Sequence, residues 1–255
     1  MQLQDLILHA SSCPPEHFIA KAAIPPVTRS PLTGATIVFD LDGTLIDTAP
    51  DLVGAANHAL ARLALPPRPA EALRPWISFG ARRMIEEGLD QCGVKQSPAR
   101  IDQLLAVFLD HYEANIARLS RPYPHVLDEI SRLTSAGASI AICTNKREAL
   151  TFKLLDALQL TQYFAAIIGR DTLPVSKPDP DHLIGTIARA GGRVERAVMV
   201  GDSGVDIATA RAARVPVVGV SFGYSDVPIK DLNPDVTIDT YANLAGVIGP
   251  LLPAV

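Results

Sequence analysis

The chain has 255 residues, 48% of them hydrophobic and 20% charged, so it can bury a large core and form one or two domains. Its 23 basic and 27 acidic side chains give a net charge of −4, and the basic ones are scattered, which argues against a nucleic acid or an anionic membrane as partner. Three dispersed cysteines, Cys13, Cys92 and Cys143, are too few for a disulfide framework or a metal knuckle and favour a reducing cytoplasm.

Residues 1–33 are rich in proline and show no clear periodicity, so we expect a disordered or loosely attached extension. This segment has no basic leader before its short apolar patch, and we therefore expect no secretory signal. No stretch of the sequence approaches the roughly 18 continuous apolar residues of a membrane-spanning helix.

From Ala35 onward, short apolar runs alternate with helical patterns, which is typical of an α/β fold. Most of these runs are continuously apolar, as expected of parallel strands that are covered on both faces. The sequence therefore predicts a doubly wound, mostly parallel sheet. The expected strands are Thr36–Phe39, Ser139–Cys143, Ala166–Ile168, Ala197–Val200, Val217–Val220 and Val236–Ile238, and the expected helices between them are Arg147–Leu158, Asp181–Ala190 and Ser203–Ala213.

Residues 49–122 break this alternation. The region contains no strand pattern, and apolar residues at three- and four-residue spacing predict helices over 51–63, 80–88 and 101–119. Its joints are rich in proline. We interpret it as a small all-helical domain inserted after the first strand, with residues 34–48 and 123–255 forming the α/β core.

Polar side chains follow four of the predicted strands. Ligands of a doubly wound sheet bind outside the carboxyl ends of its strands, so we expect these side chains to meet at one edge. They are Asp40, Asp42, Gly43 and Thr44 after the first strand, Thr144 and Asn145 after the second, Lys177 after the third, and Asp202 and Asp206 after the fourth.

The carboxylates at this edge require a cation. Asp40 and Asp42, joined by Asp202 or Asp206, would repel one another, and one of them would be forced to protonate. The candidate ligands are all oxygens, without histidine or cysteine, which favours Mg²⁺. Taken alone, Asp206 is equally typical of a charge at a helix N-terminus, and Lys177 before a proline is typical of a solvated loop.

The same edge suits a phosphoryl group. Lys177 offers a cation, Thr144 a hydroxyl, and the turn 41–44, freed by Gly43, offers backbone N–H groups. One aspartate of the Asp40 and Asp42 pair can attack phosphorus to form an acyl phosphate, and the other can protonate the leaving alkoxide and later activate water. The spacing of the two residues does not say which does which.

The segments "DLDGTLIDTAPDL", "CTNK", "KPDP" and "MVGDSGVDIATARAA" resemble, in order and spacing, the four motifs of the haloacid dehalogenase superfamily. The resemblance extends from Ala35 to about Val247. It implies Asp40 as nucleophile and Asp42 as acid and base, with Thr144 and Lys177 around the phosphoryl group. It further implies Mg²⁺ held by Asp40, the Asp42 carbonyl and Asp202, with Asp206 in an outer shell, and a helical cap domain.

Within that superfamily the wording of "LDGTLIDTAPDL", "RPYPHVLDEI", "KPDPDHL" and "VPVVGVSFGYSD" is most similar to bacterial phosphoglycolate phosphatases. This likeness implies a small phosphorylated metabolite, 2-phosphoglycolate, as substrate. Two positions depart from the pattern: His125 stands where glycine is usual, at the hinge of the cap, and Cys143 replaces an aliphatic residue.

The cap carries further candidates. We expect Trp76, Phe79 and Met84 to belong to its core, as aromatic and sulfur side chains of small helical bundles usually do. Arg82 and Arg83 follow a glycine in "WISFGARRM", a segment that resembles the substrate-contacting loop of the family. One of the two is predicted to pair with a substrate carboxylate, and the alternative is a solvated helix face.

Other functions stay open at this point. A sugar-phosphate mutase or phosphatase would share every core residue, and only the cap distinguishes it. Carbon–phosphorus cleavage would require a cap lysine able to form an imine, and the insertion has only Lys95, late in its sequence. A dehalogenase would need neither metal nor Asp42. A non-catalytic binder of phosphorylated metabolites would keep the fold without the reaction. We expect a monomer or a homodimer.

Overall fold

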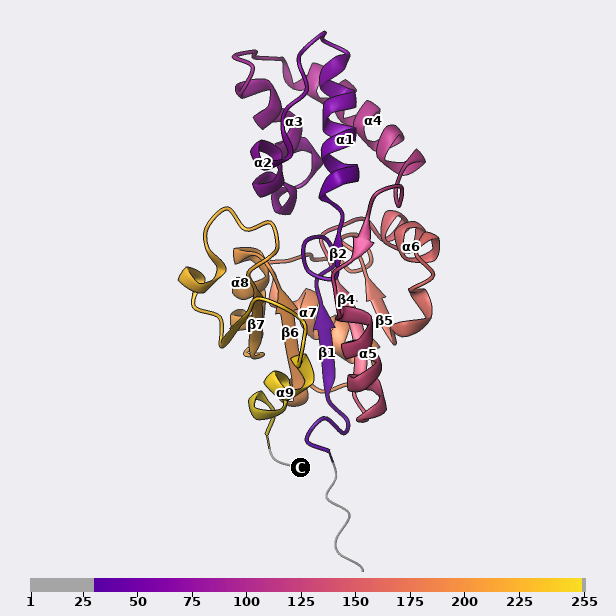
Figure 1. The fold of residues 1–255 in the computed structure, drawn as a ribbon, viewed down its shortest axis with the longest axis vertical. Coiled ribbons are helices and arrows are strands. Elements are labelled where there is room, and N and C mark those ends of the chain that lie inside the picture. Colours follow the sequence, from indigo (N-terminus) through magenta and orange to yellow (C-terminus); the bar gives the residue numbers. More distant parts are fainter. Residues whose placement is uncertain (1–29, 254–255) are drawn as a thin grey trace, which may run out of the picture.

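A computed structural model describes residues 30–253 of the chain, which form a six-stranded parallel sheet below a group of helices (Figure 1). The strands lie in the order β5-β4-β1-β6-β7-β8, and every neighbouring pair is parallel. Their bounds are β1 Thr36–Phe39, β4 Ser139–Cys143, β5 Ala166–Ile168, β6 Ala197–Gly201, β7 Val217–Val220 and β8 Val236–Ile238.

Helices cover both faces of the sheet. Successive residues of a strand point to opposite faces, and both sets of side chains are apolar. On β1, Val38 packs into one apolar cluster with Met199 of β6, while Ile37 and Phe39 pack into the other. Helices α7 and α8 cover the first face, and α5, α6 and α9 lie against the remainder of the core. Their bounds are α5 Val126–Ser135, α6 Glu148–Ala157, α7 Pro180–Arg189, α8 Gly204–Ala212 and α9 Leu244–Ile248.

The inserted helices form a bundle of their own at the carboxyl-end side of the sheet (Figure 1). Helix α1 packs against both α3 and α4, and its Leu60 is fully buried with Leu73, Ile85 and Phe108. The elements are α1 Ala49–Ala61, α2 Ala70–Leu73, the 3₁₀-helix η1 Arg74–Phe79, α3 Ala81–Asp90 and α4 Pro98–Ala114. Among residues 30–253, no helix has the length and apolar character that crossing a membrane demands.

Two chain segments join the bundle to the sheet, and they are tied to each other. The short strands β2 (Ile46–Asp47) and β3 (Arg121–Pro122) pair antiparallel. The buried carboxylate of Asp51, at the start of α1, accepts hydrogen bonds from Leu119 N, Ser120 N and Ser120 Oγ at 2.7–3.1 Å. These contacts tie the segment that enters the bundle to the segment that leaves it.

The predicted α/β class, with its parallel sheet and helical insertion, is confirmed, and all six predicted strands are present. Helix ends were less accurate: α4 begins at Pro98 instead of residue 101, because the Ser97 side chain accepts a hydrogen bond from Arg100 N and caps the helix. The β2–β3 pair and helices α5 and α9 were not predicted.

Most of the expected N-terminal extension, residues 1–29, lies outside the described residues. Its last part, from residue 30, is anchored to the core: the Arg196 guanidinium donates hydrogen bonds to the carbonyls of Pro31 and Thr33 at 2.7 and 3.1 Å.

Candidate active site

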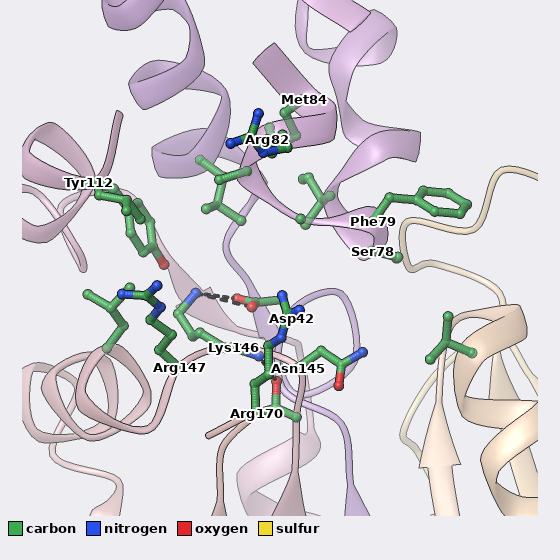
Figure 2. Close-up of a pocket in the computed structure, with 18 of the residues that line it drawn as sticks. Asp42, Ser78, Phe79, Arg82, Met84, Tyr112, Asn145, Lys146, Arg147 and Arg170 are labelled. Carbon is green, nitrogen blue, oxygen red and sulfur yellow. Dashed lines mark hydrogen bonds and ion pairs between the residues drawn. The ribbon is translucent and has the colours of Figure 1, made fainter. Parts of the chain in front are cut away.

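A cavity of about 450 Å³ lies between the carboxyl edge of the sheet and the helical insertion (Figure 2). Its floor includes Asp40 and Asp42 after β1, Thr144 after β4, and Lys177 from the loop between β5 and α7. Its roof is formed by side chains of η1, α3 and α4. The parallel register explains the floor, since β4 and β6 pair with β1 on either side and end at the same level.

Three carboxylates cluster beneath this floor. Asp40, Asp202 and Asp206 each place an oxygen within 4.8 Å of the others. Thr44 Oγ1 donates to Asp202 Oδ1 at 2.8 Å, and Tyr224 N donates to Asp202 Oδ2 at 2.6 Å. These hydrogen bonds fix the orientation of Asp202, whose side chain is fully buried.

Asp206 has two roles at once. Its Oδ2 accepts hydrogen bonds from Ser203 N and Ser203 Oγ, at 3.1 and 2.7 Å, in a capping box at the start of α8. Its Oδ1 accepts from Lys177 Nζ at 2.6 Å. The two readings of Asp206, helix cap and member of the acidic cluster, are therefore compatible.

The cluster is electrostatically strained. Burial raises the pKa of Asp40 to about 6, with Lys177 opposing the rise and Asp206 adding to it. Burial, followed by repulsion from Asp206 and Asp40, raises the pKa of Asp202 to about 8. Ionising all three carboxylates thus requires more positive charge than one lysine provides.

Lys177 is the cation already present. Its side chain is 2% exposed, and Nζ lies 2.8 Å from Asp40 Oδ1 and 2.6 Å from Asp206 Oδ1. Burial by itself lowers the pKa of Lys177, but Asp206 and Asp40 outweigh this effect, so the pKa lies above its ordinary value. The ammonium group stays charged at every physiological pH.

The donor set fits a hard divalent cation. The buried Asp40 Oδ1 accepts no aligned hydrogen bond from any residue of the described range, although Lys177 lies close to it. Together with Asp202 and Asp206 it offers only oxygen ligands, as Mg²⁺ prefers. The chain therefore has an acidic cluster suited to binding a metal ion.

Asp42 faces the open part of the cavity. Thr48 Oγ1 donates to Asp42 Oδ1 at 2.7 Å, and Lys146 Nζ lies 3.0 and 3.1 Å from the two carboxylate oxygens (Figure 2). Lys146 belongs to "CTNK", but sequence reasoning assigned it no role. Its position directly after Thr144 and Asn145, at a strand end that already carried two candidates, was the available signal.

The remaining predicted residues occupy different depths. Gly43 has φ +83°, and a Cβ there would lie 2.5 Å from Asp202 Oδ2, so the turn after β1 needs glycine. Thr44 is fully buried and binds Asp202. Asn145 lines the cavity, and its Nδ2 donates to the Lys177 carbonyl at 3.0 Å. Thr144 also lines it.

The two cap arginines are placed differently. Arg82 lines the cavity and pairs with Asp102 on α4, and its side chain is 44% exposed. Arg83 is not among the cavity-lining residues: it stacks on Trp76 and lies near Glu86 and Glu87 on its own helix.

The expectation that Phe79 belongs to the cap core is wrong, because it is 52% exposed at the cavity mouth, where Gly80 turns the chain with φ +92°. Met84, by contrast, is buried as expected, although it also lines the cavity. Tyr112, Arg147 and Arg170 also line the cavity and were not singled out from the sequence. They lie on α4 and in the loops after β4 and β5.

Comparison with known proteins agrees with this geometry. The family model for haloacid dehalogenase-like hydrolases matches residues 37–220, from β1 to the end of β7. The chain belongs to the haloacid dehalogenase-like hydrolase family. The matched segment contains the acidic cluster, Lys177 and the helical insertion.

Several members of the family are close in sequence. Phosphoglycolate phosphatase of Agrobacterium fabrum is 47% identical over 218 residues, which cover 86% of this chain and 93% of the relative. Phosphoglycolate phosphatase of Mesorhizobium japonicum is 50% identical over 205 residues, 80% of this chain and 90% of the relative. The crystal structure of a predicted phosphoglycolate phosphatase from Haemophilus somnus 129PT has a TM-score of 0.78 and 29% identity, covering 85% of this chain and 98% of the other.

Proposed function

We propose that this hydrolase is a Mg²⁺-dependent phosphatase that converts 2-phosphoglycolate to glycolate and phosphate. One observation carries the proposal: Asp40 and Asp42 share a cavity with Lys177 and Thr144, directly above the cluster completed by Asp202. The substrate follows from relatives of 47–50% identity that bear the name phosphoglycolate phosphatase and match this chain over nine-tenths of their length.

Asp40 is the proposed nucleophile. Its carboxylate oxygen attacks phosphorus, an Asp40–phosphorus bond forms, and the bond from phosphorus to the ester oxygen breaks. Asp42 gives its proton to the departing alkoxide, which leaves as glycolate. Asp42 then accepts a proton from water as that water attacks phosphorus, and cleavage of the acyl phosphate releases phosphate and restores Asp40. Thr48, which donates to Asp42 at 2.7 Å, orients this carboxylate for both steps.

Lys177 and Thr144 are proposed to hold the phosphoryl oxygens. The Lys177 ammonium, 2.8 Å from Asp40, offsets negative charge next to the nucleophile. Gly43, Thr44 and Asn145 complete the proposed substrate-binding groups. Gly43 allows backbone N–H groups close to the anion, while Thr44 acts through its hydrogen bond to Asp202.

The proposed metal ligands are Asp40, the Asp42 carbonyl and Asp202, with Asp206 as an outer partner that keeps Lys177 in place. Bound Mg²⁺ would neutralise charge on the phosphoryl group and on the clustered carboxylates. Without it, the raised pKa values of Asp40 and Asp202 leave part of the cluster protonated near neutral pH.

The helical insertion, residues 49–122, is proposed to act as a cap that closes over the cavity and excludes bulk water. Of the two arginines predicted to meet substrate, Arg82 is the better placed, since it lines the cavity and Arg83 does not. Residues 34–48 and 123–255 would form the core domain. A cytoplasmic location, supported by the unpaired Cys92 and Cys143, and a monomer or homodimer complete the proposal.

A phosphate-release screen over small phosphate esters, with and without Mg²⁺, tests this function. We expect 2-phosphoglycolate to give the highest kcat/KM and chelation to abolish turnover. A clear preference for a sugar phosphate would replace the narrow assignment with that of a sugar-phosphate phosphatase or mutase. No release from any ester, p-nitrophenyl phosphate included, would favour a non-catalytic binder of phosphorylated metabolites.

A further inference from the structure

On the leaving-group side of the cavity, the proposed reaction assigns only Asp42 and the partly exposed Arg82. Asp42 must reach the ester oxygen to protonate it, so the remainder of the substrate extends beyond Asp42 into the cavity. Two polar side chains stand next to Asp42 there: Lys146 from the loop after β4 and Tyr112 from α4 of the insertion (Figure 2).

Lys146 is a buried cation next to Asp42. Its side chain is only 5% exposed, and Asp42 supplies a carboxylate that offsets its buried charge. An ammonium group has three N–H donors, and the contacts with the two Asp42 oxygens at 3.0 and 3.1 Å leave a third donor for an anion beside Asp42.

Tyr112 brings an unused donor to the same place. The residue is 1% exposed, and its hydroxyl has no hydrogen-bond partner among residues 30–253. Lys146 Nζ lies 4.6 Å from the centre of its ring, and the hydroxyl points toward the Lys146 ammonium (Figure 2). A buried unpartnered hydroxyl next to a buried cation is a ready site for an anionic oxygen.

The substrate has such an anion at the right distance. The carboxylate carbon of 2-phosphoglycolate is two bonds from the ester oxygen, so a carboxylate must lie beside Asp42 when that oxygen is protonated. Arg82, by comparison, is 44% exposed and already paired with Asp102, and water weakens such surface contacts.

We infer that Lys146 and Tyr112 form the carboxylate-binding subsite and select esters with an anionic group next to the phosphorylated carbon. This inference rests on the proposed function. Lys146 donates its remaining N–H to the substrate carboxylate, and Tyr112 donates a second hydrogen bond from the insertion. A carboxylated ester therefore draws the core and the insertion together.

The experiment compares two esters that differ only in the group at issue. In 2-hydroxyethyl phosphate, CH₂OH replaces the carboxylate of 2-phosphoglycolate, and both release an unactivated alcohol that needs Asp42 equally. The ratio of their kcat/KM values therefore measures carboxylate recognition separately from acid catalysis. We expect the parent protein to favour 2-phosphoglycolate, and Lys146→Met to reduce the ratio roughly tenfold to hundredfold, as loss of a charged hydrogen bond implies.

Two further variants sharpen the test. Tyr112→Phe is expected to lower the ratio severalfold, with the change confined to 2-phosphoglycolate, and it carries the test if Lys146→Met does not fold. Lys153→Met is the matched control: Lys153 also bridges core and insertion, through Glu113 at 2.9 Å, but does not line the cavity. Its ratio is expected to equal that of the parent.

The possible failures are distinguishable. If Lys146→Met slows both esters equally and keeps the ratio, Lys146 only positions Asp42 and the inference is overturned. If the parent hydrolyses both esters equally well, the phosphatase stands and carboxylate selection does not. If the parent hydrolyses neither ester, the proposed function itself is overturned, and this inference with it.

Discussion

Different interactions place the residues of the cavity floor and those of the cavity roof. Of the floor residues, Asp40 and Thr144 directly follow β1 and β4, whose pairing brings them to one edge, and Lys177 comes from the loop between β5 and α7. The roof residues, such as Arg82 and Tyr112, belong to helices whose packing decides which side chains face the cavity. The positions of Asp40 and Thr144 are therefore fixed by backbone hydrogen bonds, while roof positions depend on side-chain packing.

The largest effect is expected at the floor, from Asp40→Asn. Removing the proposed nucleophile should lower kcat by at least about 10⁴-fold, measured as phosphate release, and no phosphorylated protein should be trapped by acid quench and mass spectrometry. The variant should remain folded, because burial already disfavours the charged form of Asp40. Turnover that persists in a folded variant would refute the covalent mechanism.

The joint between floor and roof is tested by Asp51→Ala. This change leaves Leu119 N and Ser120 N without their acceptor and leaves the buried Ser120 hydroxyl only the 3.5 Å contact with the Ile116 carbonyl, which should cost about 3 kcal/mol of unfolding free energy. Urea denaturation measures the loss. Asp110→Ala, at an exposed position of α4, is the control and should change stability by less than about 0.5 kcal/mol. Equal stabilities of the two variants would contradict the proposed anchoring.

Gly43→Ala probes how tightly the floor is packed. The added Cβ would lie 2.5 Å from Asp202 Oδ2 and 2.7 Å from the Tyr224 ring, at a backbone φ of +83°. We expect about 2 kcal/mol of strain, seen as a roughly thirtyfold loss of Mg²⁺ affinity by calorimetry. Gly54→Ala in α1 has open space around its Cβ and should instead raise stability slightly. Unchanged Mg²⁺ binding by Gly43→Ala would place the metal elsewhere.

The floor should also respond to pH. The pKa values of Asp40, about 6, and Asp202, about 8, lie above the ordinary 3.8, so their neutral forms are favoured in the metal-free fold. These two groups therefore stabilise the fold least at high pH, with the contribution lost as pH rises from about 4 toward 8. Because Mg²⁺ needs ionised carboxylates, its affinity should rise at least about tenfold from pH 6 to pH 8. The rise in melting temperature with Mg²⁺ measures this, and an equal rise at both pH values would count against the carboxylate site.

The smallest effects are expected from the roof arginines. Arg82→Ala should raise KM for 2-phosphoglycolate by at most about fivefold, since the Arg82 side chain is 44% exposed and already forms an ion pair with Asp102. Arg83→Ala should leave KM unchanged, because Arg83 lies outside the cavity lining and contacts Trp76. Steady-state kinetics with the two variants separates them. A larger effect from Arg83 would mean that the cap closes in a different orientation.

The sequence predicted the six strands and the residues that follow them, because a buried parallel strand has a continuous apolar pattern and its carboxyl end is where ligands bind. It did not predict strands β2 and β3, because two residues are too few to show an apolar strand pattern. Nor did it predict that Phe79 is exposed at the cavity mouth or that Lys146 contacts Asp42.

What the sequence by itself determined is the chemistry of the floor, from Asp40 to Asp206, since acids crowded at one sheet edge require a cation wherever the remaining chain lies. The tertiary structure alone decided the surroundings of Asp42. Tyr112 and Lys146 are 34 residues apart along the chain, and no periodicity relates them, yet packing of α4 over the loop after β4 places the Lys146 ammonium 4.6 Å from the centre of the Tyr112 ring. Contacts between a helix and a distant loop depend on side-chain packing in three dimensions, which a local pattern does not encode.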